Sequence, residues 1–202
     1  MNSETYTYSS TAIRTYTGRR FDYLQSAVDD INIFDVAIHL AREPRWAGAT
    51  KLTFTVGQHL VHTCDWIEEI GGTRVDQLLG LIHDATEFAT KDLPKPLKNC
   101  LPGYKELENR IWDRICLHFF NQKVKLPQIV KDVDGVMLNA ENRDLRAYYH
   151  ADENYVTGLD TYPHKLVPWP EEKIIIEFLS RFNILYTQSV LKDPQWETLI
   201  IS

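Results

Sequence analysis

Residues 80–98 read GLIHDATEFATKDLPKPLK, a stretch in which an apolar helical pattern runs into ionisable side chains and then into two prolines. Apolar residues recur at i, i+3, i+4 and i+7, at Val75, Leu78, Leu79 and Ile82. This spacing predicts a helix with one face packed in a core. The prolines predict that the helix ends before them.

Three polar side chains follow the apolar face. On a continuous helix, His83 and Glu87 lie one turn apart on the same face, and Asp84 lies about 100° round from His83. All three border the core face, so we expect them to point into the domain. Burying unpaired carboxylates is costly, and a cation held among them offsets that cost. The group therefore predicts a divalent metal, and imidazole with carboxylate suits zinc, manganese, cobalt or iron better than calcium.

Further ligands must come from other helices, because one His-Asp pair cannot fill a coordination shell. The candidates are His59 in TVGQHLVH and Asp134 in VKDVDGV, each within an apolar helical run. Each also has an ordinary alternative. A single histidine in such a run is often a hydrogen-bonded core residue, and a single aspartate often faces solvent or an arginine.

The rest of the chain is dominated by the helical period. Further helices are expected within residues 31–43, 53–72, 103–120, 127–149 and 168–190. The apolar stripe of the last is broad, which predicts a nearly buried helix. The first two dozen residues are rich in Thr and Tyr and predict short extended pieces around Gly18. We therefore expect an all-α helical bundle with a short extended N-terminal segment, built as one domain over residues 1–202.

Composition excludes several classes of protein. The 202 residues are 44% hydrophobic and carry a net charge of −6, which argues against binding to nucleic-acid polymers or anionic membranes. The start, MNSETYTYSS, lacks the apolar core of a signal peptide, and no apolar run approaches the roughly 20 residues of a membrane span. We expect a cytoplasmic protein. Cys64, Cys100 and Cys116 form no CxxC pair, so neither a disulfide framework nor a thiolate zinc site is indicated.

Four short motifs, taken in order, resemble a known family. They are QH at 58–59, LIHDATE at 81–87, KDLPKPLK at 91–98 and VKDVDGVML at 130–138. Together they resemble the HD-domain metal-dependent phosphohydrolases, in the branch that holds bacterial 5′-deoxynucleotidases and phage dATP triphosphohydrolases. The resemblance runs from about residue 13 to about residue 146. It implies an HD-domain helical bundle with its core at about 30–150 and a C-terminal helix at about 169–190.

The resemblance also implies roles for individual residues. His59, His83, Asp84 and Asp134 match the ligands of one divalent metal per subunit, which is Mn²⁺, Co²⁺, Zn²⁺ or Fe²⁺, with Mg²⁺ as an alternative. Glu87 matches the catalytic acidic residue that positions or deprotonates the attacking water. Asp92 matches a second catalytic acid, which assists at the reacting phosphate or the leaving oxygen.

The substrate contacts implied by the resemblance begin in PRWAG. Arg45 takes a phosphate role and Trp46 a place beside the sugar or base. Lys91, Lys95 and Lys98 supply positive charge near the entrance of the same substrate site. The ordinary alternatives are a surface ion pair for Arg45 with Glu43 or another acid, a core or interface position for Trp46, and solvated side chains for Lys95 and Lys98.

The remaining residues of interest are assigned lesser roles. His62, three residues after His59, is expected to support the ligands or to line the pocket. Glu141, with Arg143 and Arg146, is expected to form surface ion pairs on a helix.

The function implied is hydrolysis of a small deoxynucleotide. We favour a dATP triphosphohydrolase that releases deoxynucleoside and tripolyphosphate, with a 5′-deoxynucleotidase acting on dNMPs as the alternative. A non-catalytic HD module that binds nucleotides is the remaining hypothesis. A homo-oligomer, either a dimer or a hexamer, is expected from the branch and from the aromatic content. The setting is the cytoplasm, or the host cytoplasm if the gene is carried by a phage.

Overall fold

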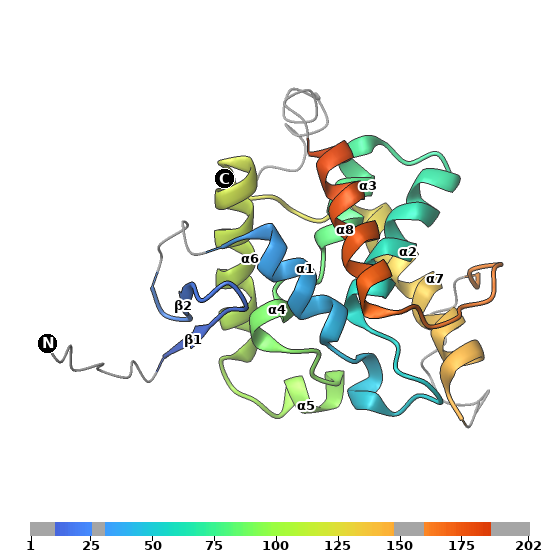
Figure 1. Ribbon diagram of the computed structural model, residues 1–202, viewed down its shortest axis with the longest axis horizontal. Coiled ribbons are helices and arrows are strands. Elements are labelled where there is room, and N and C mark those ends of the chain that lie inside the picture. The colour runs from blue at the N-terminus through green and yellow to red at the C-terminus, as the bar shows by residue number, and fades with distance from the viewer. Residues whose placement is uncertain (1–10, 26–30, 148–159, 187–202) are drawn as a thin grey trace, which may run out of the picture.

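The computed structural model describes residues 11–25, 31–147 and 160–186. Within these ranges no helix is both long enough and apolar enough to span a membrane. The helices are α1 (Ile33–Arg42), the 3₁₀ helix η1 (Arg45–Gly48), α2 (Val56–Glu69), α3 (Arg74–Ile82), α4 (Glu87–Thr90), α5 (Lys95–Asn99), α6 (Tyr104–Phe120), α7 (Gln128–Leu145) and α8 (Glu171–Leu185). The predicted all-α class is confirmed (Figure 1).

The extended N-terminal segment is a two-stranded antiparallel sheet. Strand β1 (Ala12–Arg14) pairs with β2 (Arg20–Asp22), and Ile13 lies opposite Phe21. Gly18 in the turn between them has φ +82°, a conformation that glycine adopts without steric cost. The prediction of extended pieces around Gly18 is therefore confirmed.

Side chains cap the first turn of three of the helices. Asn32 accepts a hydrogen bond from the backbone of α1, and Thr55 accepts one from the backbone of α2. Thr73 and Asp76 form a reciprocal capping box at α3. Each cap satisfies backbone N–H groups that a helix leaves unpaired at its first turn.

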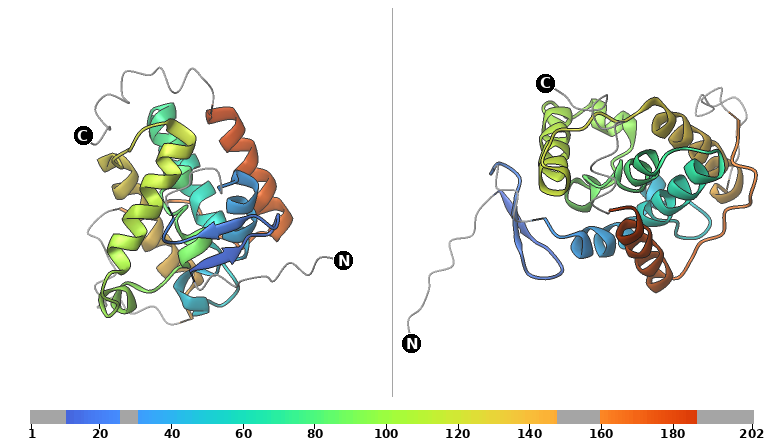
Figure 2. Two further views of the ribbon diagram at one scale, coloured as in Figure 1. Left: turned by 90° about the vertical axis from the view of Figure 1, so that its left-hand side faces the viewer. Right: turned by 90° about the horizontal axis from the view of Figure 1, so that it is seen from above.

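Helix α2 runs through the middle of the bundle and contacts α1, α3, α7 and α8 (Figures 1 and 2). Glycine permits two of the close approaches. A Cβ atom at Gly57 would lie 2.9 Å from both the Ala41 backbone nitrogen and a methyl carbon of Ile174, and one at Gly80 would lie 2.4 Å from a methyl carbon of Ile67. The polar residues of α2 are thereby held at a fixed depth inside the bundle.

The helix predicted to continue through His83 and Glu87 is interrupted. Helix α3 ends at Ile82, and α4 begins at Glu87. Between them the backbone forms i to i−3 bonds, from Ala85 N–H to the Ile82 carbonyl at 2.8 Å and from Glu87 N–H to the Asp84 carbonyl at 3.0 Å. The His83 ring binds the Gly80 carbonyl, which an uninterrupted helix would offer to Asp84 N–H. The continuous helix was therefore a wrong prediction.

Helix α8 lies within the expected range 169–190, but it is not nearly buried. Ile174 and Phe178 lie in the core, whereas Ile176 is 63% exposed and Ile184 is 60% exposed. The reason is that α8 packs on α1, α2 and α3 with one face only. The apolar residues on its other face point outward.

Candidate metal centre

The four predicted ligands meet at one point. His59 comes from α2, His83 and Asp84 from the turn after α3, and Asp134 from α7, and one ligand atom of each lies within 4.8 Å of the others. The Nε2 atom of His59 is 3.2 Å from Oδ1 of Asp134 and 3.4 Å from Nε2 of His83. Oδ2 of Asp84 is 3.4 Å from Nε2 of His83. These separations suit atoms that share one central ion.

Both histidine rings are turned so that Nε2 faces this point. The Gly80 carbonyl can only accept, so Nδ1 of His83 carries the hydrogen of that 2.8 Å bond. Nδ1 of His59 donates to Oε1 of Glu141 at 2.7 Å in the same way. When both rings are neutral, two Nε2 lone pairs and two carboxylates face one another, an arrangement that a cation stabilises. A carbonyl or carboxylate behind the ring is the usual partner of a metal-binding histidine.

The electrostatics of these side chains also favour positive charge at the cluster. Burial lowers the pKa of His83, but the nearby Asp84 and Asp134 carboxylates outweigh it and raise that pKa to about 9. Burial raises the pKa of Asp134, yet its hydrogen bonds to His59 and His83 bring the pKa well below the ordinary value. Two imidazoles and two carboxylates form a donor set that fits a metal ion. The cluster can therefore bind one.

Glu141 contradicts its predicted surface role. Its side chain is fully buried, and its carboxylate accepts from Nδ1 of His59, from Nε of Arg45 at 2.7 Å and from the indole N–H of Trp46 at 2.8 Å. On α7, Glu141 is seven residues after Asp134, so both lie on the same helix face. The sequence interpretation missed Glu141, although its seven-residue spacing from Asp134 was visible in the sequence.

Arg45 and Trp46 are held beside the cluster by η1. Arg45 is 7% exposed, and its Nη1 lies 3.6 Å from Oδ2 of Asp84. The alternative of a surface pair with Glu43 is wrong, because Arg45 pairs with buried Glu141 instead. Trp46 has φ +59°, a left-handed conformation that is uncommon for a bulky residue. This turn brings the indole N–H and the guanidinium onto the same carboxylate.

Glu87 is buried beside the cluster with one oxygen unpaired. It is 4% exposed, and its Oε1 lies 3.3 Å from Nζ of Lys98. Within the described residues, its Oε2 has no hydrogen-bond partner. Burial, together with the charges of Asp84 and Asp92, raises its pKa well above the ordinary value. Glu87 is thus a carboxyl group whose proton affinity is high for its type.

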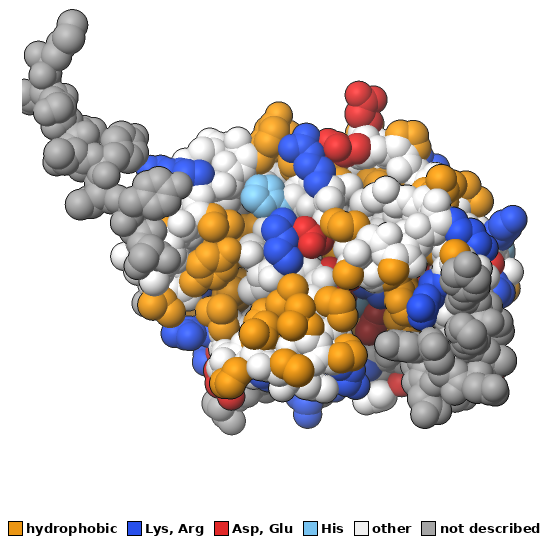
Figure 3. All heavy atoms as spheres, turned by 90° about the horizontal axis from the view of Figure 1, so that it is seen from below, with side chains coloured by type: hydrophobic (Ala, Val, Ile, Leu, Met, Phe, Trp, Pro, Cys, Tyr) orange, Lys and Arg blue, Asp and Glu red, His pale blue; other side chains and the backbone are white. Residues whose placement is uncertain are grey.

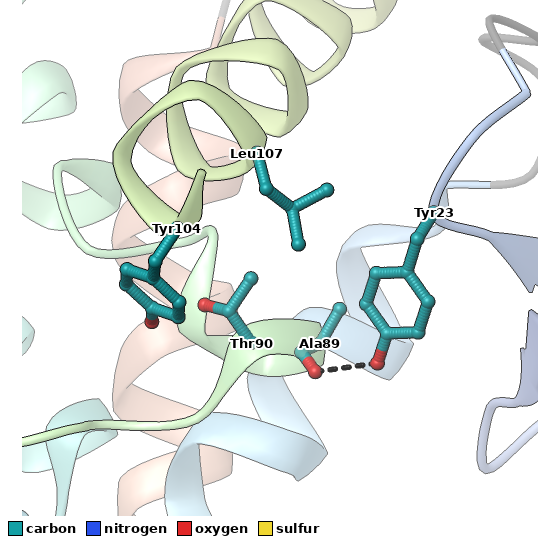
Figure 4. Close-up of a pocket in the computed structure, with 5 residues that line it drawn as sticks. All are labelled: Tyr23, Ala89, Thr90, Tyr104 and Leu107. Atoms are coloured by element: carbon teal, nitrogen blue, oxygen red, sulfur yellow. Dashed lines mark hydrogen bonds between the residues drawn. The ribbon is translucent and has the colours of Figure 1, made fainter. Parts of the chain in front are cut away.

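Helix α4, which carries Glu87, also borders a cavity. The cavity has a volume of about 230 Å³ and is lined by Tyr23, Ala89, Thr90, Tyr104 and Leu107. Figure 4 shows Tyr23 and Tyr104 on opposite sides of it, and the Tyr23 hydroxyl donates to the Ala89 carbonyl at 2.7 Å. The N-terminal sheet therefore helps to fix the position of α4.

The remaining predicted residues lie on the segment between α4 and α6. Burial raises the pKa of Asp92, whose backbone N–H donates to Glu43 at 3.3 Å. Lys91 pairs with Glu43 at 2.8 Å, and Lys95 is exposed on α5. Lys98 is not simply solvated, because it also binds Glu108 at 2.8 Å. The face drawn in Figure 3 shows acidic side chains in the depth of a hollow beside an apolar surface.

His62 does not join the cluster. Its ring is parallel to that of Phe54 within 6°, packs against Trp169 with centroids 4.7 Å apart, and lies 3.2 Å from the Gln58 amide nitrogen. Burial lowers its pKa to about 4. Its place among aromatic rings makes it a packing residue of α2.

The fold and the cluster define an all-α protein with a His/Asp site able to hold a metal ion. No family model matches the chain. It is 36% identical over 137 residues to the uncharacterized protein YfdR of Escherichia coli strain K12, a match that covers 66% of this chain and 71% of YfdR. The chain belongs to the family of YfdR. An uncharacterized protein of Rhodobacter capsulatus is 29% identical over 157 residues, covering 72% of this chain and 78% of that protein.

Proposed function

We propose that this protein is a metal-dependent phosphohydrolase of the HD-domain type that acts on small deoxynucleotides. The observation that carries the proposal is the buried carboxyl of Glu87, with an unpaired oxygen, beside four converging ligand atoms. Hydrolysis of a phosphate ester needs a cation at the phosphate, a group that takes a proton from water, and a group that neutralises the negative charge on the leaving oxygen. The residues of this site are of the types that meet these needs.

His59, His83, Asp84 and Asp134 would hold the metal. When bound, a divalent transition metal supplies Lewis-acid polarisation of the phosphate and lowers the pKa of a water molecule. We propose Mn²⁺, Co²⁺, Zn²⁺ or Fe²⁺, because the ligand set mixes imidazole with carboxylate. Mg²⁺ is the alternative.

The side chains around the ligands would handle protons and charge. Glu87 takes the proton of the attacking water, and its raised pKa brings its proton affinity closer to that task. Asp92 gives a proton to the leaving 5′ oxygen, and burial raises its pKa in the direction that this role requires. Arg45 offers its guanidinium to the phosphate, and Trp46 borders the nucleoside. Lys91 and Lys95 supply further positive charge at the entrance.

The bond broken would join the 5′ oxygen to the α-phosphorus, with the oxygen of water added to phosphorus and a proton delivered to the 5′ oxygen. We favour dATP as substrate, with deoxyadenosine and tripolyphosphate as products. The alternative is a 5′-deoxynucleotidase that releases phosphate from dNMPs. Both reactions break the same bond, so the same residues serve either.

A substrate survey tests the proposal. Metal-free protein is incubated with each dNTP and each dNMP plus Mn²⁺ or Co²⁺, and the products are separated by chromatography with phosphate detection. Tripolyphosphate and deoxyadenosine from dATP alone are expected. Orthophosphate from dNMPs alone would identify the 5′-deoxynucleotidase. No turnover with any metal would favour a non-catalytic nucleotide-binding module.

We also propose that the protein works in the cytoplasm as a homo-oligomer, either a dimer or a hexamer. Ile176 and Ile184 on the outer face of α8 supply exposed apolar surface of the kind that subunit interfaces bury. Size-exclusion chromatography with light scattering measures the mass directly. A monomer at micromolar concentration would contradict this part of the proposal.

A further inference from the structure

A second pocket lies where β1, α1 and the segment after α4 come together. Its volume is about 320 Å³. It contains none of the four metal-ligand candidates. The residues that line it are Arg14, Thr15, Tyr16, His39, Arg42 and Lys91.

Three of these residues are cations, and none of the six is acidic. Arg14, Arg42 and Lys91 come from three separate parts of the chain, so their approach is produced by the fold and not by local sequence. Like charges brought together in one cavity repel one another. An anion bound between them is attracted to all three and makes the net electrostatic energy favourable. Basic and histidine side chains are visible close together on the face of Figure 3.

The existing partners of these cations leave donors for a ligand. Arg42 binds Glu171 at 2.7 Å, and Lys91 binds Glu43, but neither acid lines the pocket. Arg14 donates one bond to the backbone carbonyl of Gly18. A guanidinium has five N–H donors and an ammonium has three, so each cation can bind an anion without releasing its present partner.

The walls of the pocket are fixed by hydrogen bonds. His39 donates from Nδ1 to the Phe88 carbonyl at 2.9 Å and accepts at Nε2 from the Tyr16 backbone N–H at 3.1 Å, so it ties α1 to both neighbouring segments. The Thr15 hydroxyl lies 2.8 Å from the buried carboxylate of Asp35. The pocket is therefore formed before any ligand arrives, which lowers the entropic cost of binding.

We propose that this pocket binds a phosphate-bearing anion, with Arg14, Arg42 and Lys91 as its contacts. Arginine matches phosphate with paired hydrogen bonds, and lysine adds a point charge. The phosphate is either free oligophosphate or part of a nucleotide. The site shares Lys91 with the proposed substrate entrance, but its walls need neither the metal nor Glu87, so anion binding can be tested without hydrolase activity.

Calorimetric titration of the full chain, stripped of metal by a chelator, tests the site. Tripolyphosphate, orthophosphate and dATP are each titrated at low salt. Removing one charged contact is expected to weaken binding about 10-fold or more, so Arg14→Gln and Arg42→Gln should each do so. Arg110→Gln is the matched control, since Arg110 is exposed on α6 and does not line the pocket. Circular dichroism verifies that each variant is folded.

The outcomes separate the two sources of phosphate and can overturn the site. Equal affinity for tripolyphosphate and dATP, lost in both pocket variants, supports recognition of phosphate alone. Binding of dATP only, with the same loss, supports a nucleotide ligand. If both pocket variants bind as tightly as the unaltered protein, or no anion binds at all, the site does not exist. Neither result depends on turnover, so failure here is distinct from failure of the proposed hydrolase.

Discussion

His59 and His62 lie three residues apart on α2, yet their surroundings have opposite effects on them. His59 faces the carboxylates of Glu141 and Asp134, which outweigh the effect of burial and raise its pKa. His62 faces aromatic rings, and burial lowers its pKa to about 4. The residue type is the same, so the difference comes from neighbours that other segments supply. The region of α2 around His59 therefore stabilises positive charge, and the region around His62 disfavours it.

The largest expected effect is loss of metal when a ligand is removed from the charged region. His59→Gln and Asp134→Asn should each weaken metal affinity by more than the roughly 10–100-fold typical of residues that merely support a ligand. His62→Gln, one turn away on α2, should leave metal content unchanged. Elemental analysis of protein dialysed against Mn²⁺ measures all three. Equal loss in the His62 variant would show that the two regions are not distinct.

The next effect concerns catalysis without loss of metal. Glu87→Gln keeps the shape of the side chain but cannot take a proton, so the rate on the best substrate should fall by about 10²-fold or more. Metal content should stay that of the unaltered protein, because Glu87 is not among the converging ligands. Steady-state kinetics and elemental analysis on the same preparation give both values. Full activity in this variant would remove Glu87 from the mechanism.

A smaller effect is expected from the carboxylate behind His59. Glu141→Gln keeps one oxygen that can accept but replaces the other with an NH₂ group, so the three donors can no longer all be satisfied and the orientation of the His59 ring is less fixed. Metal affinity should fall about 10–100-fold. Glu177→Gln is the control, because Glu177 also binds an arginine, Arg181, but lies on α8 away from the cluster. Competition with a metal-binding dye measures both affinities, and equal values would contradict the role of Glu141.

Some features of the molecule were predictable because they depend on local sequence. The cap at Thr55 and the apolar spacing of α3 follow from residues a few positions apart. The four ligand candidates were identified through a polar group beside an apolar face and through the order of motifs. Their convergence in space was an expectation until the packing of α2, α3 and α7 was known.

Other features depend on contacts that spacing alone does not reveal. The break after Ile82 coincides with the hydrogen bond between the His83 ring and the Gly80 carbonyl, and a helical pattern contains no sign of it. The exposure of Ile176 depends on how many neighbours α8 has. Glu141 was only partly predictable. Its seven-residue spacing from Asp134 was visible in the sequence, but this spacing indicates a buried position only if Asp134 is known to face inward.

The last effect is on the free energy of unfolding as pH changes, and its direction differs between His83 in the metal cluster and His62 among the aromatic rings. The pKa of His83 in the folded, metal-free protein is about 9, above its ordinary value of about 6.5. Its stabilising contribution is complete below pH 6.5 and is lost as pH rises through 9. The pKa of His62 is about 4, so its contribution is lost as pH falls from 6.5 through 4. Each slope is at most about 1.4 kcal/mol per pH unit.

Urea unfolding between pH 4 and pH 9 separates these two contributions. Metal loading should abolish the loss on the alkaline side, because a metal binds the deprotonated ring that high pH favours. His62→Phe should reduce the loss on the acid side, since the parallel packing on Phe54 suits another ring and the titrating group is gone. It should leave the alkaline side unchanged, because the carboxylates that raise the pKa of His83 are untouched. A variant that altered both sides equally would show that the two histidines belong to one electrostatic unit.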